Sequence, residues 1–362
     1  MLTCHGRSRR TANTIRTMTF DRPQWTPCRV STMAATWMKY REDLEDLVLA
    51  HPRIFPGYRK GDRDFDDPGG LMNRPGRKTD CWGTVWDNVE RGLSSHPVAF
   101  PLADWADFDA YQPPDPITDD FLEPRRPWEE TRAALAAAKA RGNLAQGGGL
   151  PHGFMYMRLF YLRGFENLMM DMALADPRLP RLIRMVEDYN LAVIAQYVAC
   201  GAETMRFGDD LGLQDRLPMG PALWRTYVGP AYRRILSPCR EADVPVYLHT
   251  DGHVLEVIPD LIEAGVRVIN PQIGANGLEG LREIARGKVC IDLDLDRQFF
   301  PFATPAQIEN HIGEAYEALY LPEGGLMLFA ECEPDVPLEN IEAICSTLER
   351  ICNPPEPDPA GA

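Results

Sequence analysis

The stretch that decides the fold is VPVYLHTDGHVLEVIPDLIEAGVRVINPQ, residues 244–272. A short apolar run rich in β-branched residues ends abruptly at His249, a helical pattern follows, and a second apolar run ends at Asn270. Short apolar strands that alternate with helices of roughly 10–15 residues are typical of a parallel sheet. The stretch therefore predicts a strand–helix–strand unit of an α/β protein.

The same alternation continues along the chain. Because so many strand–helix units follow one another, we expect a single (β/α)8 TIM barrel with an N-terminal extension rich in proline and tryptophan. Residues 1–33 are expected to be disordered or to include a misassigned start, residues 34–352 to form the barrel, and the proline-rich residues 353–362 to be disordered. The further strand patterns cover 203–212, 288–296 and 325–333, and the helical ones 278–287, 304–320 and 337–351.

Composition limits the class of protein. The chain has 362 residues, of which 44% are hydrophobic, and a formal charge of -15, which argues against a nucleic-acid binder. Nine cysteines without a C-x-x-C spacing favour reduced thiols and a cytoplasmic protein. No apolar run approaches the ~18 residues that a membrane helix needs. A soluble globular protein that acts on a small molecule is expected.

Polar side chains mark the carboxyl ends of five successive predicted strands. In a barrel these ends converge on one mouth, where active sites lie. The clustering therefore predicts an enzyme whose site uses several of these residues. They are Asp209 and Asp210; His249 and Asp251; Asn270 and Gln272; Asp292, Asp294 and Asp296; Glu331 and Cys332.

His249, Asp251 and Cys332 could bind a metal. Imidazole and thiolate suit zinc, a carboxylate is an acceptable third ligand, and three protein ligands leave the open position of a catalytic site. Two alternatives remain: a polar strand end beside a buried cysteine, or an acid/base pair of His249 and Asp251 with Asp210 as a substrate anchor.

Two acidic runs supply further candidates. Asp209 and Asp210 are neighbours on a strand and point to opposite faces, so at most one can face the mouth. Three buried aspartates in CIDLDLDRQ would need partners, so we expect this strand to end near Asp292 or Leu293. The following loop would then bring Asp296 and Arg297 to the site. Substrate contacts are expected from Asp209, Gln272, Asp292, Asp296, Arg297 and Glu331.

The glycine-rich stretch AQGGGLPHG, residues 145–153, lacks the spacing of a phosphate-binding or dinucleotide loop, so no nucleotide cofactor is expected. His152 and Arg158, which follow the glycines, are candidate substrate contacts. Cys345 and Cys352 lie seven residues apart and would share one apolar face of the closing helix.

Three segments carry a family resemblance: FGDDLGLQDRLPMGPALWRTYVGPAYRRIL (207–236), the stretch 246–272, and GGLMLFAECEPDVPLENIEAI (324–344). Together they resemble the uroporphyrinogen decarboxylase superfamily, which also contains methylcobamide:coenzyme M methyltransferases and related corrinoid-linked enzymes. The resemblance spans roughly residues 75–350 and implies a (β/α)8 barrel with its site at the carboxyl mouth.

Two branches of that superfamily differ in their motifs. True decarboxylases carry an M-R-Q-A-G-R segment, and the comparable STMAATWMKYRED (31–43) lacks it. In the methyltransferase branch, His249 matches the histidine among the family's zinc ligands and Cys332 the last cysteine, whereas Asp251 stands where a cysteine is expected. The resemblance thus implies metal-assisted methyl transfer, with zinc, from a corrinoid or a methylated small molecule to a thiol-type acceptor.

The resemblance leaves two other functions open: decarboxylation of uroporphyrinogen III, and a barrel that binds a tetrapyrrole or corrinoid without turnover. The partners expected are a small-molecule substrate, a corrinoid protein and a second copy of the chain in a homodimer. Neither a nucleic acid nor a membrane is expected as a partner.

Overall fold

The computed structural model describes residues 2–148 and 153–356. The chain divides into two compact units, which are described separately. The first unit comprises Met1–Ile15, Arg77–Asp87 and His96–Pro271. The second comprises Arg16–Gly76, Asn88–Ser95 and Gln272–Ala362.

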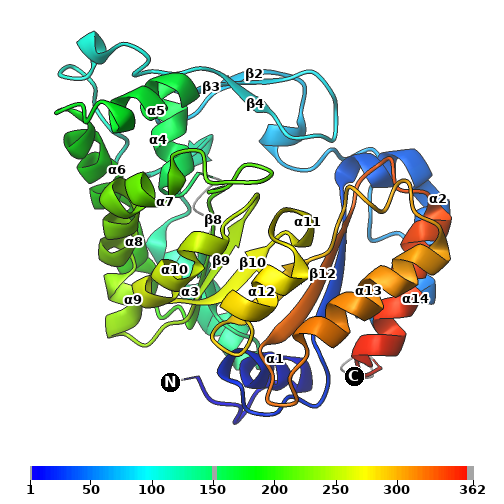
Figure 1. The fold of residues 1–362 in the computed structure, drawn as a ribbon. Helices are drawn as coiled ribbons and strands as arrows, with labels where there is room; N and C mark the ends of the chain where they lie inside the picture. Colours follow the sequence, from blue (N-terminus) through cyan, green and yellow to red (C-terminus); the bar gives the residue numbers. More distant parts are fainter. Residues whose placement is uncertain (1, 149–152, 357–362) are drawn as a thin grey trace. The chain divides into compact units, whose positions relative to one another are not determined.

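Four parallel strands form the centre of the first unit (Figure 1). They are, in spatial order, β7 (Gln146–Gly148), β8 (Thr204–Gly208), β9 (Val246–Thr250) and β10 (Val266–Pro271). The register pairs Gly208 with His249 and His249 with Asn270, so the polar carboxyl ends of β8, β9 and β10 lie side by side. This is the arrangement that the strand-end pattern predicts.

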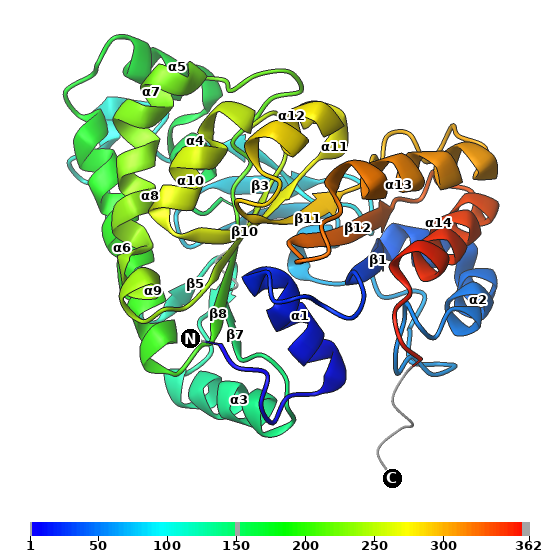
Figure 2. The ribbon, with the colours of Figure 1, turned by 60° about the horizontal axis from the view of Figure 1, so that its bottom comes forward.

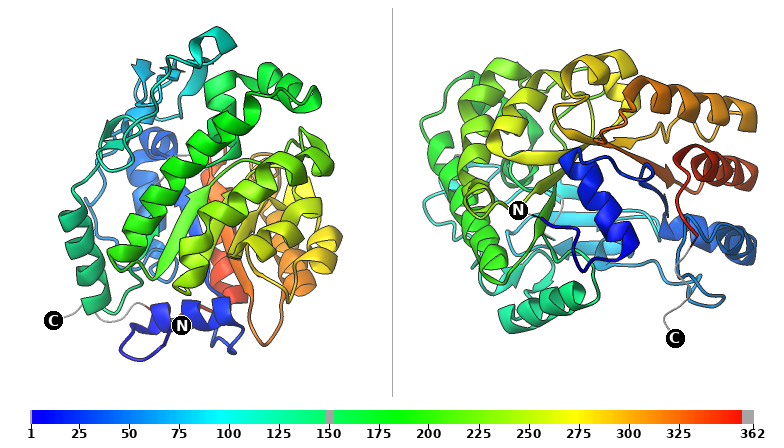
Figure 3. Two further views of the ribbon diagram at one scale, coloured as in Figure 1. Left: turned by 90° about the vertical axis from the view of Figure 1, so that its left-hand side faces the viewer. Right: turned by 90° about the horizontal axis from the view of Figure 1, so that it is seen from below.

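Helices cover the apolar residues of these strands, and the long helix α6 (Leu179–Ala199), green in Figure 3, lies beside the shorter helices that follow β8. Pro230 interrupts the helical stretch after β8, which is divided into several pieces. The helices of this unit are α3 (Trp128–Ala140), α4 (Tyr156–Arg163), α5 (Phe165–Ala173), α6, α7 (Gly220–Leu223), η3 (Trp224–Val228), α8 (Gly229–Ile235), α9 (Ser237–Glu241), η4 (Leu255–Val257) and α10 (Ile258–Ala264).

The second unit has three parallel strands in the order β1 (Cys28–Thr32), β12 (Leu326–Cys332) and β11 (Cys290–Asp294). Helices α13 (Pro305–Leu319) and α14 (Leu338–Cys352) pack side by side, and α2 (Ala34–Ala50) contacts α14 (Figure 2). Helix α13 begins with the capping box of Thr304 and Gln307. The remaining helices are α11 (Ile273–Asn276), α12 (Leu278–Ile284) and η1 (Leu71–Asn73).

The proline- and tryptophan-rich region contributes short elements. A three-stranded sheet has the order β2 (Gly76–Thr79), β3 (Val85–Asn88) and β4 (His96–Ala99), with β3 and β4 antiparallel. The same region also contains helix η2 (Trp105–Asp107) and a separate pair of strands, β5 (Asp119–Asp120) and β6 (Glu123–Pro124). No helix in the described ranges is both long and apolar enough to cross a membrane.

These elements confirm an α/β fold with seven parallel strands among the described residues. The N-terminal expectation was wrong in part, because residues 1–33 include helix α1 (Arg9–Thr19) and strand β1. Pairing with β12 orders β1, and burial of Ile15 anchors α1, neither of which short-range patterning reveals. Strand β11 also runs on to Asp294, beyond the predicted end. Of the predicted disordered tail, residues 357–362 lie outside the described residues.

Candidate functional site

The loops that follow β8 and β9 lie against each other at Gly212 and Gly252. Gly212 donates its N–H to the carbonyl of Asp251 at 3.1 Å. Gly252 has φ +80°, and a Cβ there would lie 2.2 Å from the carbonyl carbon of Gly212. The glycine of the H-T-D-G sequence is therefore required both by its backbone conformation and by this close approach.

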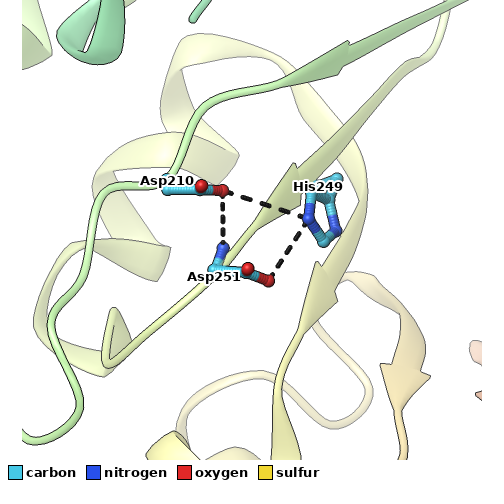
Figure 4. A group of neighbouring side chains, drawn as sticks. All are labelled: Asp210, His249 and Asp251. Carbon is cyan, nitrogen blue, oxygen red and sulfur yellow. Dashed lines mark hydrogen bonds and ion pairs between the residues drawn. The ribbon is translucent and has the colours of Figure 1, made fainter. Parts of the chain in front are cut away.

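His249 is held between two elements at the carboxyl end of β9 (Figure 4). Its Nδ1 lies 2.8 Å from Oδ1 of Asn270, the residue paired with it on β10, and its Nε2 lies 3.3 Å from Oδ1 of Asp251. An amide oxygen can accept a hydrogen bond but cannot donate one, so Nδ1 of His249 carries the proton in this contact. The tautomer is thereby fixed, and Nε2 faces the acidic residues.

Asp210 completes the group of ligand atoms. Its Oδ1 lies 4.0 Å from Nε2 of His249 and accepts a hydrogen bond from the backbone N–H of Asp251 at 3.2 Å. One ligand atom each from Asp210, His249 and Asp251 lie within 4.8 Å of one another. All three side chains are between 20% and 30% exposed, so a small molecule or an ion can reach them. We call these three residues the acidic–histidine cluster.

The charge of the cluster acts on His249. Burial alone would lower its pKa, but the carboxylates of Asp251 and Asp210 and the hydrogen bond to Asn270 together raise it to about 9. At neutral pH and without another cation, His249 is therefore an imidazolium between two carboxylates. The cluster is thus arranged to attract positive charge.

Asp209 has a different position from its neighbour. Its fully buried carboxylate accepts hydrogen bonds from the backbone N–H groups of Met155, Tyr156 and Met157, at 2.8–3.1 Å, and from the hydroxyl of Tyr232 at 2.7 Å. It therefore satisfies the amino end of α4. Burial raises the pKa of Asp209, against these hydrogen bonds. Both aspartates follow Gly208, the last residue of β8, and face different surroundings: Asp209 is buried against the start of α4, whereas Asp210 belongs to the acidic–histidine cluster.

Arg158 lies in the first unit and is 2% exposed. Its Nη1 donates to Oδ2 of Asp80 at 3.0 Å, and its guanidinium lies 5.2 Å from the ring of Trp82. Asp80 also accepts hydrogen bonds from the backbone N–H groups of Trp82 and Thr84. Arg158 thus links α4 to the loop before β3. The contact between Arg158 and a substrate remains a prediction. His152 lies outside the described residues.

The other predicted substrate contacts belong to the second unit. Oδ2 of Asp292 lies 2.8 Å from Nη2 of Arg29, and Nη1 of Arg297 lies 2.7 Å from Oε2 of Glu331. Asp296 accepts hydrogen bonds from two backbone N–H groups of its own loop. Gln272 precedes α11 and forms a parallel bridge with Asp294. Their contacts with a substrate remain predictions.

Cys332, the predicted thiolate ligand, is fully buried in the second unit. On β12 it shares a face with Leu328 and Ala330, opposite the face where Phe329 stacks against Arg29. It is a near neighbour of Cys345 on α14, and burial raises the pKa of the Cys332 thiol. The structure therefore places Cys332 on the helix-covered face, and Asp210 instead supplies the third ligand atom of the cluster.

The sequence placed Asn270 among the polar strand ends but predicted no role for it. It was visible as a polar strand end, but its contact with His249 depends on the register of β9 and β10. The ion pair of Asp80 with Arg158 was missed as well, because the two residues are 78 positions apart in the sequence.

A family model described as "Uroporphyrinogen decarboxylase (URO-D)" matches residues 94–351. The chain belongs to this family. The match includes all three residues of the acidic–histidine cluster and confirms the resemblance seen in the sequence. No curated protein matches the chain in a comparison of sequences.

One solved structure supports the fold of this URO-D family member. A methyltransferase from Methanosarcina mazei superposes with a TM-score of 0.61 at 15% identity, covering 94% of this chain and 98% of that chain. A B12-independent methionine synthase from Shewanella sp. W3-18-1, in complex with selenomethionine, has a TM-score of 0.40 at 11% identity, covering 62% and 65%. At these identities the first comparison establishes the fold, and the second carries no further argument.

Proposed function

We propose that this URO-D family member is a methyltransferase in which Asp210, His249 and Asp251 bind one divalent metal ion. The observation that carries the proposal is the convergence of their three ligand atoms within 4.8 Å, with the histidine oriented through its other nitrogen by Asn270. An oriented imidazole of this kind is a usual feature of metal sites. The similarity to a methyltransferase structure supports the reaction type.

The chemistry of the donor set fits such an ion. One imidazole nitrogen and two carboxylate oxygens suit zinc, and also harder divalent ions such as Mn²⁺ or Fe²⁺. The raised pKa of His249 supports the same conclusion, because the two carboxylates already favour a proton at Nε2. A metal ion would take the place of that proton and leave His249 neutral.

In this proposal each residue has a defined task. His249 releases its Nε2 proton and offers the lone pair, while Asn270 keeps the ring in place through Nδ1. A bound ion would lower the pKa of an acceptor thiol, whose anion would take the methyl group while the donor keeps the electron pair of the broken bond. The carboxylates of Asp210 and Asp251 compensate the positive charge of the ion, and the thiol proton passes to solvent. The donor is a methylated corrinoid, carried by a corrinoid protein, or a methylated small molecule.

A second candidate follows from the imidazolium form of His249. A protonated histidine with a pKa of about 9 can donate a proton to carbon, as decarboxylation of uroporphyrinogen III requires. In that reaction no metal is needed, and Asp210 anchors the substrate. The two candidates therefore differ in whether activity depends on a metal.

The proposal extends to the fold. The seven parallel strands are proposed to belong to a closed (β/α)8 barrel, which would bring the strand ends to a single mouth. The cytoplasm is the proposed location, in line with nine free cysteines.

The test combines metal analysis with two assays. Purified protein is expected to contain one divalent ion per chain and to convert methylcobalamin and a small thiol into a thioether. His249→Ala and Asp251→Asn should lose both properties, whereas Cys332→Ala should keep both. Metal-free wild-type protein that decarboxylates uroporphyrinogen III would establish the second candidate instead. A corrinoid that binds without turnover in metal-loaded protein would indicate a binding protein.

A further inference from the structure

Four cysteines of the second unit gather between its sheet and helix α14. Cys345 and Cys352 lie on one buried face of α14, as their spacing predicts. Cys28 on β1 and Cys332 on β12 occupy the strand face turned toward that helix, because Cys28 pairs with Leu328 and shares its side of the sheet. None of these thiols belongs to the acidic–histidine cluster.

Within this group, Cys28 and Cys352 form a pair. The two thiols are close enough that Cys28 raises the pKa of Cys352. Cys28 is the first residue of β1, an edge strand in this unit, and Cys352 is the last residue of α14. The two elements are in contact, and Thr26, two residues before Cys28, lines the same cavity as Cys352, so the two cysteines lie in the same part of the unit.

The pair is accessible from solvent. Cys28 is partly exposed, whereas Cys352 is 2% exposed and lines a cavity of about 130 Å³. Trp25, Thr26, Tyr316 and Tyr320 form other parts of the wall, and the two tyrosine rings stack 4.9 Å apart. The cavity touches Leu326, where β12 begins, and so lies at the amino end of that strand. A small reagent can therefore reach Cys28 at the surface, while Cys352 borders the cavity.

A metal site at this position is not supported. A metal needs at least three ligand atoms close together, and among the described residues no such group contains Cys28 or Cys352. Two adjacent thiols with an opening to solvent are instead the arrangement in which a disulfide forms.

We propose that Cys28 and Cys352 form a reversible disulfide that fastens the end of α14 to β1, with a low-molecular-weight disulfide as the oxidant. The thiolate of Cys28 attacks one sulfur of the oxidant and releases one thiolate, giving a mixed disulfide. Cys352 then loses its proton to that released thiolate and attacks the sulfur of Cys28, and the second half of the oxidant leaves as a thiolate. Two protein thiols are oxidised, and the oxidant is reduced to two small thiols.

The order of attack follows from burial. The neighbouring thiol of Cys28, together with burial, raises the pKa of Cys352, so this thiol is a poor first nucleophile. Cys28 is the more exposed partner and meets the oxidant first. The resulting bond would join positions near the two ends of the chain, which restricts the unfolded state strongly. Oxidised protein should therefore resist unfolding better than reduced protein.

The test uses the full-length protein, equilibrated with mixtures of oxidised and reduced glutathione. After denaturation, alkylation is expected to label seven of the nine cysteines in oxidised protein, and peptide mass mapping to find a Cys28–Cys352 linkage. Oxidation should raise the melting temperature, and dithiothreitol should reverse both changes. Cys28→Ser and Cys352→Ser should abolish them, while the matched control Cys239→Ser, a buried cysteine of α9, should not.

Three results would overturn the proposal. They are labelling of all nine cysteines after oxidation, a mixed disulfide of glutathione and Cys28 that does not react further, or a disulfide between a different pair of cysteines. The serine variants are compared with wild type in their reduced forms by circular dichroism, so that misfolding is recognised. If Cys352→Ser does not fold, Cys28→Ser and the wild-type peptide map decide the question.

Discussion

The side chain of Asn270 holds His249 from the next strand, with Oδ1 2.8 Å from Nδ1 of the imidazole. The two residues face each other in the register of β9 and β10, so the contact is built into the sheet. It fixes which nitrogen carries the proton and turns Nε2 toward Asp210 and Asp251. The proposed metal site therefore depends on a residue that is not itself a ligand.

Replacing Asn270 with alanine should weaken metal binding without removing it. The ring of His249 would lose its orientation, and loss of such a partner typically lowers metal affinity about 10–100-fold. Metal titration followed by calorimetry measures the change. Asn167→Ala removes an exposed asparagine of α5 and should leave the affinity unchanged. An N270A variant with wild-type affinity would show that Asn270 does not position the histidine.

The metal-free protein should lose stability as the pH rises above neutral. The folded pKa of His249 is about 9, above the unfolded value of 6.5, so its contribution is complete below pH 6.5 and is lost as the pH rises through 9. The difference corresponds to about 3 kcal/mol at most. Urea unfolding at pH 6 and pH 9.5 in the presence of a chelator measures it. His249→Gln should abolish most of this pH dependence, whereas His253→Gln, in the loop that follows β9, should retain it. Equal slopes in all three proteins would contradict the assignment.

The adjacent aspartates should respond in opposite ways. Asp209→Ala removes the acceptor of four buried hydrogen bonds at the start of α4 and should cost about 3 kcal/mol or more of unfolding free energy. Asp210→Ala should change stability by less than about 1 kcal/mol and abolish metal binding. Chemical denaturation and metal content, measured on both variants, give the comparison. The reverse pattern would mean that their roles are exchanged.

The approach of Gly252 to Gly212 predicts a strong effect of a single methyl group. Gly252→Ala would place Cβ 2.2 Å from backbone atoms at φ +80°, so the two loops must separate. Melting temperature and metal affinity should both fall. Gly313→Ala is the matched control, because its Cβ would meet nothing within 4 Å on helix α13, where alanine favours the helix by about 0.5–1 kcal/mol. A stable G252A variant with intact metal binding would contradict this account of the H-T-D-G sequence.

Much of the fold was readable in the sequence because strands β8 to β12 and their helices have regular hydrophobic periods. The strand-end pattern also predicted that polar residues after β8, β9 and β10 lie together, and the parallel register explains this. The N-terminal strand β1 was missed because its order comes from pairing with β12, far away in the chain.

The contacts within the site could not be predicted from the sequence, because they depend on the direction in which each side chain points. Cys332 was a reasonable thiolate candidate by position, yet strand alternation turns it toward Cys345 and the helices. The strand was expected to end near Asp292 or Leu293, but it runs on to Asp294, and an ion pair with Arg29 allows Asp292 to be buried within it. Asn270 could be recognised only from strand register. A sequence indicates which residue types stand at a strand end. Which of these residues contact each other depends on the register of neighbouring strands in the sheet.

X-ray absorption at the metal edge of substrate-free, zinc-loaded protein tests the central claim most directly. The account predicts a first shell of nitrogen and oxygen atoms at about 2.0–2.2 Å, with the signature of one imidazole and no protein sulfur. His249→Ala should bind no zinc at this site. A sulfur ligand at about 2.3 Å in wild-type protein, lost in Cys332→Ala, would contradict the assignment of the metal to Asp210, His249 and Asp251.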